Sequence, residues 1–218
     1  MLSRSCPIPA ERKPSWSARY LSRQAAQPSG AFGWLLGRIW LAETAEVNDV
    51  ALELLAPAHG ERVCEIGFGP GRTLTQLAAA GADVVGVEVS GQMLAVAGRR
   101  NADPIAAGNM SLHCGDGTTL PLPDDSLDAV LSVHNVYFWP HPGATLADIA
   151  RTLRTGGRLV LTSLADDHPL PERFDPTIYR VPTIADTTSW LHSAGFVDVG
   201  IHRRPHIPTT VWFTATAT

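Results

Sequence analysis

The stretch that decides the fold is residues 62–71, which read RVCEIGFGPG. Its first half, Arg62–Ile66, is a short, mostly apolar run of the kind that forms a buried β-strand. Its second half carries glycine at three alternate positions, Gly67, Gly69 and Gly71. There the backbone can turn sharply, and a ligand can lie against it without meeting a Cβ atom. With a helix expected at 73–80, this succession indicates an α/β fold with a ligand site at the loop.

The alternation of short β-rich runs and amphipathic helices continues along the chain. Further strands are expected at 83–89, 111–114, 127–133 and 158–162, with helices at 92–100 and 145–153. Strands that alternate with helices predict a parallel, doubly wound sheet.

The last fifty residues depart from this rhythm. A loop rich in proline and charge is expected at 166–183, followed by a helix at 187–194. Strands at 196–201 and 210–215 then follow each other without a helix between them. Such strands pair antiparallel, so we expect a hairpin at the edge of the sheet.

The N-terminal segment has a different composition. Residues 1–30 contain one acid, Glu11, and five cations: Arg4, Arg12, Lys13, Arg19 and Arg23. We expect a flexible, solvated segment there, although a basic, serine-rich start is also typical of a transit peptide. Apolar residues then recur at helical spacing before Pro57, which predicts one or two helices. We therefore expect a single domain at 31–218 with an N-terminal helical cap at 31–57.

The composition excludes several classes of protein. Of the 218 residues, 44% are hydrophobic and 17% charged, which is typical of a folded domain with a full core. A formal net charge of −4 argues against nucleic-acid binding by bulk electrostatics. No run of about 18 apolar residues is present to span a membrane. Cys6, Cys64 and Cys114 show neither metal-binding nor disulfide spacing, so we expect no metal site and a cytoplasmic protein.

Three acidic residues at strand ends indicate which ligand the glycine loop binds. Arg72 occupies the place where a dinucleotide fingerprint needs glycine or alanine, and Glu65 would repel a pyrophosphate. The loop instead suits a cofactor that carries an amine and no phosphate. Glu88, at the end of the second strand, can accept hydrogen bonds from both hydroxyls of a ribose. Asp116, after the third strand, can accept one from an exocyclic amine such as that of adenine.

Four segments carry a resemblance to a known family: VCEIGFGPG (63–71), GVEVSGQML (86–94), HCGDGTTLPLPDDSLDAVLSVHNVYFW (113–139) and LRTGGRLVLT (153–162). The chain resembles the class I S-adenosylmethionine-dependent methyltransferases, and among them the small-molecule branch similar to enzymes of ubiquinone and menaquinone biosynthesis. The resemblance covers roughly residues 45–165. It implies a Rossmann-like, doubly wound, seven-stranded, mainly parallel sheet with an antiparallel last strand and helices on both faces.

The resemblance also implies a role for each residue of these motifs. Glu65 and the backbone of Gly67, Gly69 and Gly71 would hold the methionine end of S-adenosylmethionine. Glu88 would bind the ribose hydroxyls, Val89 and Met93 would lie on the two faces of the adenine, and Asp116 with Gly117 would bind its edge. Met93 equally suits the hydrophobic core.

The fourth expected strand ends at SVHNVYFWP (132–140), where the family places the methyl acceptor. This segment lacks the (Asn/Asp)-Pro-Pro-(Tyr/Phe) signature of enzymes that methylate amino groups of adenine or glutamine, which disfavours nucleic-acid and release-factor acceptors. Tyr137 and Trp139 predict an apolar pocket for a planar or lipophilic small molecule. His134 is the candidate catalytic residue, either as a general base or as a hydrogen-bond partner of the cofactor.

Two functional hypotheses follow. The first is a methyltransferase, monomeric or homodimeric, that transfers a methyl group from S-adenosylmethionine to an oxygen, nitrogen or carbon atom of a small molecule. The alternative is a non-catalytic member of the fold that binds the cofactor or a protein partner, because the glycine loop and Glu88 predict binding and not turnover. In the first case, the loop at 166–183 and the N-terminal helices are expected to shape the acceptor pocket.

Overall fold

The computed structural model describes residues 15–30 and 44–218. Its helices are α1 (Trp16–Ala26), α3 (Ala45–Leu55), α4 (Arg72–Ala79), α5 (Gly91–Arg100), α6 (Ala102–Ala106), the 3-10 turn η1 (Val136–Phe138), α7 (Pro142–Thr152) and α8 (Ile184–Ser193). Its strands are β1 (Arg62–Ile66), β2 (Asp83–Glu88), β3 (Met110–Cys114), β4 (Leu127–Val133), β5 (Leu153–Leu164), β6 (Phe196–His202) and β7 (Thr210–Ala217).

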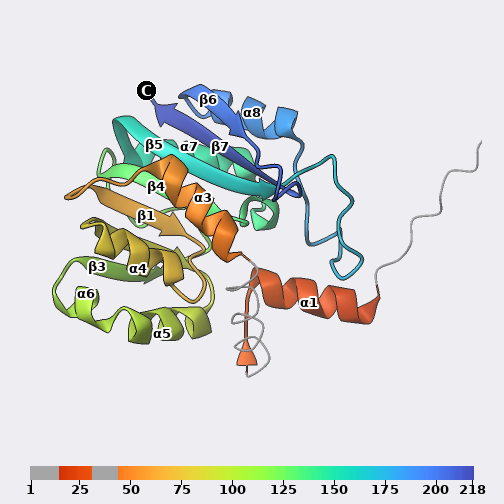
Figure 1. The fold of residues 1–218 in the computed structure, drawn as a ribbon, viewed down its shortest axis with the longest axis horizontal. Helices are drawn as coiled ribbons and strands as arrows, with labels where there is room; N and C mark the ends of the chain where they lie inside the picture. The colour runs from red at the N-terminus through yellow and green to blue at the C-terminus, as the bar shows by residue number, and fades with distance from the viewer. Residues whose placement is uncertain (1–14, 31–43) are drawn as a thin grey trace, which may run out of the picture.

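The seven strands form one sheet in the order β3-β2-β1-β4-β5-β7-β6 (Figure 1). From β3 to β5 all neighbouring strands are parallel. β7 lies between β5 and β6 and pairs antiparallel with both. This arrangement confirms the mainly parallel, doubly wound sheet, its antiparallel last strand and the C-terminal hairpin at the sheet edge.

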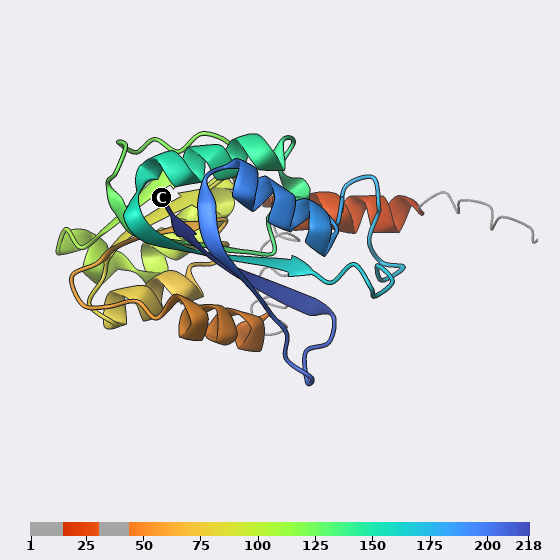
Figure 2. The same cartoon turned by 90° about the horizontal axis from the view of Figure 1, so that it is seen from above.

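Each face of the sheet buries its own apolar cluster, because successive strand residues point to opposite sides. Val63 and Val84 belong to the cluster that α3, α4 and α5 cover. Cys64 and Val85 belong to the other cluster, which α7 and α8 cover. Figure 2 shows the two layers of helices on either side of the sheet. Strands buried on both faces leave only their ends exposed, so ligand contacts fall to the loops at the carboxyl ends of the strands.

The largest difference from the predicted bounds is in β5. The strand expected at 158–162 begins at Leu153, directly after α7, and runs to Leu164. Leu153 pairs with Leu127 on β4, and the register shifts between that pair and the next. Gly156 and Gly157 therefore lie inside an irregular strand.

Residues 15–30 correct the expectation of a solvated N-terminal segment. They include α1, which lies beside the loop at 165–183 (Figure 1). The side chain of Ser15 caps the helix by accepting the N–H of Ala18 at 3.1 Å. Ser22 is fully buried and accepts the N–H of Asp175 at 2.7 Å. Residues 1–14 lie outside the described residues, as does 31–43 of the expected helical cap, whose described part is α3.

Candidate active site

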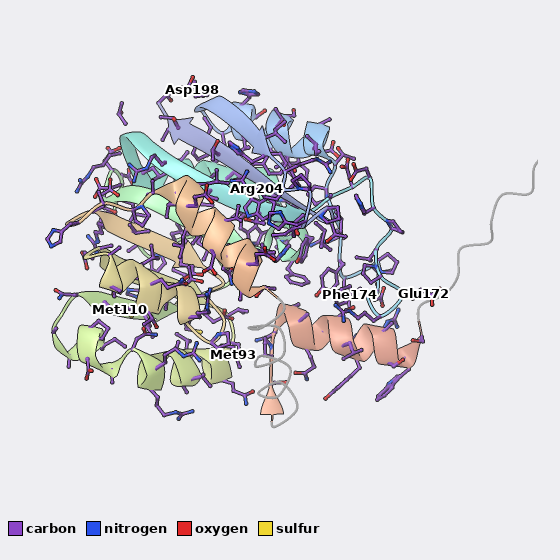
Figure 3. All side chains as sticks on the ribbon, viewed as in Figure 1. Met93, Met110, Glu172, Phe174, Asp198 and Arg204 are labelled. Carbon is purple, nitrogen blue, oxygen red and sulfur yellow. The ribbon has the colours of Figure 1, made fainter. Side chains whose placement is uncertain are left out.

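A cavity of about 540 Å³ opens at the carboxyl ends of the parallel strands. One part of its wall comes from the β1–α4 loop and the end of β2, including Glu65, Gly69 and Glu88. The other part comes from the segment after β4 and from the loop at 165–183. Figure 3 shows Met93 on α5 and Phe174 beside α1, and both line this cavity.

Glu65 places a carboxyl group inside the cavity wall. Glu65 is 3% exposed, and its Oε2 is buried without a hydrogen-bond partner in the protein. Burial raises the pKa of Glu65 to about 8, a hydrogen bond with Thr73 opposes that rise, and the charge of Glu88 adds to it. A buried acceptor without a donor is costly, so the site is complete only when a ligand donates to it. An ammonium group fits this requirement in both charge and hydrogen bonding.

Glu88 and Gly69 lie next to each other. The backbone N–H of Gly69 donates to Oε2 of Glu88 at 3.0 Å, and the N–H of Ser90 donates to Oε1 at 2.8 Å. Burial raises the pKa of Glu88, and these backbone donors counteract it. Each carboxylate oxygen has further lone-pair capacity, so both can also accept a ligand hydroxyl. A Cβ atom at Gly69 would meet nothing within 4 Å, which leaves the backbone open to the cavity.

At Gly67, Gly71 and Gly117, the absence of a Cβ atom leaves room for neighbouring protein side chains. A Cβ atom at Gly71 would lie 2.7 Å from that of Ala97 on α5, and one at Gly117 would lie 2.6 Å from Cγ2 of Ile66. Neither Gly71 nor Gly117 is among the residues that line the cavity. Gly67 does line it, but its missing Cβ leaves room for the side chain of Asn135 and not for a ligand.

Of the residues expected around adenine, Val89, Met93 and Asp116 line the cavity, whereas Gly117 does not. Val89 and Met93 line it, and Met93 is only 1% exposed, so it also serves the core. Asp116 lines the cavity from an exposed position. Its Oδ1 accepts the N–H of Thr118 at 3.0 Å and the hydroxyl of Thr118 at 2.7 Å, and both bonds lower the pKa of Asp116. A ligand amine would therefore meet an ionised carboxylate held in a fixed direction.

His134 follows β4 in an uncommon conformation. Its φ of +59° lies in the left-handed region, and its N–H donates to the carbonyl of Thr162 at 3.0 Å. His134 is half-buried and lines the cavity. Its Nδ1 atom is buried and has no hydrogen-bond partner in the protein. Burial lowers the pKa of His134 to about 4, so the imidazole is neutral at pH 7. Strain of this kind concentrates at functional sites, where the surrounding structure maintains it.

Asn135 is a site residue that the sequence analysis missed. Its Nδ2 donates to the carbonyls of Ile66 at 2.8 Å and Val133 at 2.9 Å, so it ties the end of β4 to the end of β1. It lines the cavity beside Gly67. The available signal was a short amide side chain two residues after the end of a strand.

Aromatic rings form the other end of the cavity. Tyr137 and Trp139 line it as predicted, with 4% and 3% of their surfaces exposed. The loop at 165–183 adds Phe174 and Tyr179, whose ring centroids lie 4.3 Å apart, and Tyr179 lies 4.8 Å from Tyr137. The loop therefore forms part of the cavity wall. Phe174 and Tyr179 lie in a loop, so no helical or strand periodicity marked them as buried in the sequence. Aromatic residues in a proline-rich loop were the only indication that they line a pocket.

The N-terminal segment closes one side of the cavity. Ala25, Ala26, Gln27 and Pro28, at the end of α1 and just beyond it, line the wall. The carbonyl of Pro28 accepts the hydroxyl of Ser90 at 2.6 Å, next to Glu88. At the other side of α1, Arg19 donates to the buried Asp175 at 3.2 Å. α1 therefore connects the Glu88 end of the cavity to the loop that carries the aromatic rings.

Within residues 15–30 and 44–218, no group of three or more His, Cys, Asp or Glu side chains is arranged to hold a metal ion. No helix in the same ranges is long and apolar enough to cross a membrane.

Residues 64–161 match a family described as "Methyltransferase domain". The chain is 33% identical to "O-methyltransferase cnsE" of Penicillium expansum over a 168-residue alignment, which covers 71% of this chain and 60% of the fungal protein. It is 30% identical to a "Demethylmenaquinone methyltransferase" of Clavibacter sepedonicus over 173 residues, covering 66% of this chain and 69% of that relative. The fold is similar to a SAM-dependent methyltransferase from Aquifex aeolicus, with a TM-score of 0.64, 18% identity and coverage of 78% and 89%.

The fungal relative is thus matched over less than two thirds of its length, whereas the bacterial relative is matched over more. The site agrees with these likenesses, because the unpaired oxygen of Glu65 and the open face of Gly69 suit a cofactor with an amine. The chain belongs to the class I S-adenosylmethionine-dependent methyltransferase family.

Proposed function

We propose that this chain transfers the methyl group of S-adenosylmethionine to a small molecule bound at the aromatic end of the cavity. The observation that carries the proposal is the buried, unpaired Oε2 of Glu65, in the same cavity as the rings of Tyr137, Phe174 and Tyr179. The end of the cavity at Glu65 suits a cation, and the end lined by the aromatic rings suits an apolar group. A sulfonium cofactor and a planar acceptor meet these two requirements.

The residues of the glycine-loop end would hold the cofactor. Glu65 would pair with its ammonium group, Glu88 would accept its ribose hydroxyls, and the backbone at Gly69 would lie against it. Val89 and Met93 would lie on the adenine faces, and Asp116 would bind the amine at the adenine edge. When bound, S-adenosylmethionine supplies a methyl group that is electrophilic because it is attached to a sulfonium.

His134 would act at the junction of the two ends. As a neutral imidazole it could accept the proton of an oxygen, nitrogen or carbon acid, or hold the acceptor by a hydrogen bond. The aromatic walls would exclude water and hold the acceptor in line, and alignment alone provides a large acceleration. The protein would work in a reducing cytosol as a monomer or homodimer, with Cys64 and Cys114 as free thiols.

The test has two steps. Calorimetry should show one S-adenosylhomocysteine bound per chain. Incubation with methyl-labelled S-adenosylmethionine and a metabolite extract should then give a labelled small molecule by mass spectrometry. Failure to bind would refute the proposal, and binding without any labelled product would favour the non-catalytic alternative.

A further inference from the structure

We propose that Asn135 recognises the charge of the cofactor: its side-chain oxygen faces the sulfonium of S-adenosylmethionine and strengthens its binding relative to S-adenosylhomocysteine, whose sulfur is uncharged. This inference rests on the proposed function, because it takes the cofactor to be anchored at Glu65 and Glu88. It adds a residue by which the protein distinguishes the methyl donor from the spent cofactor.

The side-chain amide of Asn135 has a fixed orientation. Its Nδ2 donates to the carbonyl oxygens of Ile66 at 2.8 Å and Val133 at 2.9 Å, and to Oγ of Ser132 at 3.3 Å. Reversing the amide would place Oδ1 against two carbonyl oxygens, which accept hydrogen bonds and donate none. The ends of β1 and β4 therefore hold Nδ2, and Oδ1 is directed away from their carbonyl groups.

Oδ1 of Asn135 is left available to a ligand. Within residues 15–30 and 44–218, no group donates a hydrogen bond to this atom. Asn135 is partly buried and lines the cavity, and Oδ1 is not among its enclosed polar atoms. A carbonyl oxygen carries a partial negative charge, so this part of the wall suits a positively charged group.

The amide of Asn135 lies over Gly67, between the two proposed anchors of the cofactor. A Cβ atom at Gly67 would overlap Oδ1. Gly67 follows Glu65 by two residues, and its N–H donates at 2.7 Å to the carbonyl of Val87, the residue before Glu88. In S-adenosylmethionine the sulfur joins the amino-acid part to the ribose. A cofactor anchored at Glu65 and Glu88 would therefore bring its sulfonium to the region of Gly67.

The two forms of the cofactor differ in what they offer to Oδ1. The sulfonium carries a positive charge, which polarises the C–H groups of its methyl. Polarised C–H groups form weak hydrogen bonds with carbonyl oxygens. S-adenosylhomocysteine has neither the charge nor the methyl group, so it gains nothing from this contact. Oδ1 therefore shifts the ratio of the two affinities toward the methyl donor.

Two other groups compete for Oδ1: the ammonium of the cofactor and a hydroxyl or amine of the methyl acceptor. The ammonium already has the unpaired Oε2 of Glu65, which leaves the sulfonium as the cationic centre for Asn135. The three assignments predict different results. Loss of an oxygen that binds the ammonium weakens both cofactor forms equally, and loss of one that binds only the acceptor weakens neither.

The experiment measures the Kd of S-adenosylmethionine and of S-adenosylhomocysteine by calorimetry, without a methyl acceptor. Asn135→Ala should lower the affinity ratio of methyl donor to product by about two- to fivefold. Asn135→Asp should retain or raise the ratio, because an oxygen remains in the place of Oδ1. Ser132→Ala is the matched control. It removes a hydroxyl from the same contact between β1 and β4, does not line the cavity, and should leave the ratio unchanged.

Equal losses of affinity for both molecules in Asn135→Ala would overturn the inference and assign Oδ1 to the ammonium. Unchanged affinities would also overturn it, as would a ratio that falls equally in Asn135→Asp or in Ser132→Ala. If Asn135→Ala does not fold, Asn135→Ser, which retains a donor but not the amide oxygen, should show the same fall. Binding to the wild type tests the proposed function: if neither molecule binds, that function fails, whereas binding of both with an unchanged ratio refutes this inference alone.

Discussion

Folding and ligand binding place opposite demands on Glu65. Its pKa, raised by burial from 4.5 to about 8, keeps it protonated in the ligand-free fold at pH 7, whereas the unfolded chain ionises it. The folded state therefore holds the extra proton between these values, and stability falls as the pH rises through that window. In Glu65→Gln this loss should disappear. In thermal unfolding, the stability of the variant relative to the wild type should increase as the pH rises from about 5 to 8.

The same substitution should weaken S-adenosylhomocysteine binding, because a neutral amide cannot pair with an ammonium group. Greater stability with lower affinity in one variant would separate a binding role from a folding role. Wild-type affinity in Glu65→Gln would remove Glu65 from the cofactor site.

Glu88 should contribute to affinity through two ligand hydroxyls. Glu88→Ala should weaken S-adenosylhomocysteine binding by roughly several-fold to a hundredfold, since hydrogen bonds to a charged group contribute about 1.5–3 kcal/mol. The substitution also removes the acceptor of the Gly69 and Ser90 N–H groups, so a folded variant must be confirmed by circular dichroism. Unchanged affinity in a folded variant would show that the ribose binds elsewhere.

The open backbone at Gly69 allows a sharper test. Gly69→Val should abolish S-adenosylhomocysteine binding, because the new side chain would project into the cavity. Its φ of +54° adds strain, so the matched control is Gly108→Val, at φ +77° with equally open surroundings but outside the cavity. Both variants should lose similar stability, and only the first should lose binding. Gly67→Val is a poor test because it would displace Asn135.

His134 can be assigned by its pH dependence. Because burial lowers its pKa to about 4, a catalytic base at this position should give an acidic limb in kcat near pH 4 and full activity at pH 6. His134→Gln should lower kcat at least about tenfold and abolish the limb. A variant with near-normal kcat and an intact limb would leave alignment as the source of the rate.

Among the elements, α1 and the loop at 165–183 depend on each other. Ser22→Ala would leave the buried N–H of Asp175 without its acceptor, at a cost of about 1–3 kcal/mol. The ion pair between the exposed Arg19 side chain and the buried Asp175 carboxylate cannot replace it, because that pair involves the side chain of Asp175 and not its N–H. We expect faster hydrogen exchange across residues 16–26 and faster release of S-adenosylhomocysteine. Ser17→Ala, on the exposed face of α1, should change neither, and slow exchange in Ser22→Ala would show that α1 is held by other contacts.

The sequence predicted those elements that have a pattern of their own. β1 and β4 have the expected bounds because their apolar runs are buried on both faces. α1 was missed because its buried face consists of Ala18, Ser22 and Gln24, while Trp16 and Tyr20 are exposed. The roles of the glycines were also not predictable from the sequence. Gly69 faces the cavity and Gly71 packs against α5, yet both are glycines of the same loop motif. The difference depends on what packs opposite, which is set by residues distant in the chain.

At the scale of the whole molecule, the cavity links stability to ligand concentration. A ligand that binds only the folded state, present at a hundred times its Kd, stabilises that state by about 2.7 kcal/mol. For a chain of this size, this corresponds to a rise in Tm of about 5–11 °C. Thermal scans with S-adenosylhomocysteine should show this shift in the wild type and lose most of it in Glu88→Ala. An equal shift in both would place the ligand outside the cavity.

The contact between α1 and the loop at 165–183 can form only late in the synthesis of the chain. Arg19 and its partner Asp175 are 156 positions apart. At about 5–20 residues per second, Arg19 is made roughly 8–30 s before Asp175. Through that interval the helix has no loop to dock on, while the strands from β1 to β5 are synthesised. α1 is therefore synthesised well before the loop that holds it in place. The wall that α1 adds to the cavity can form only after the strands from β1 to β5 have been synthesised.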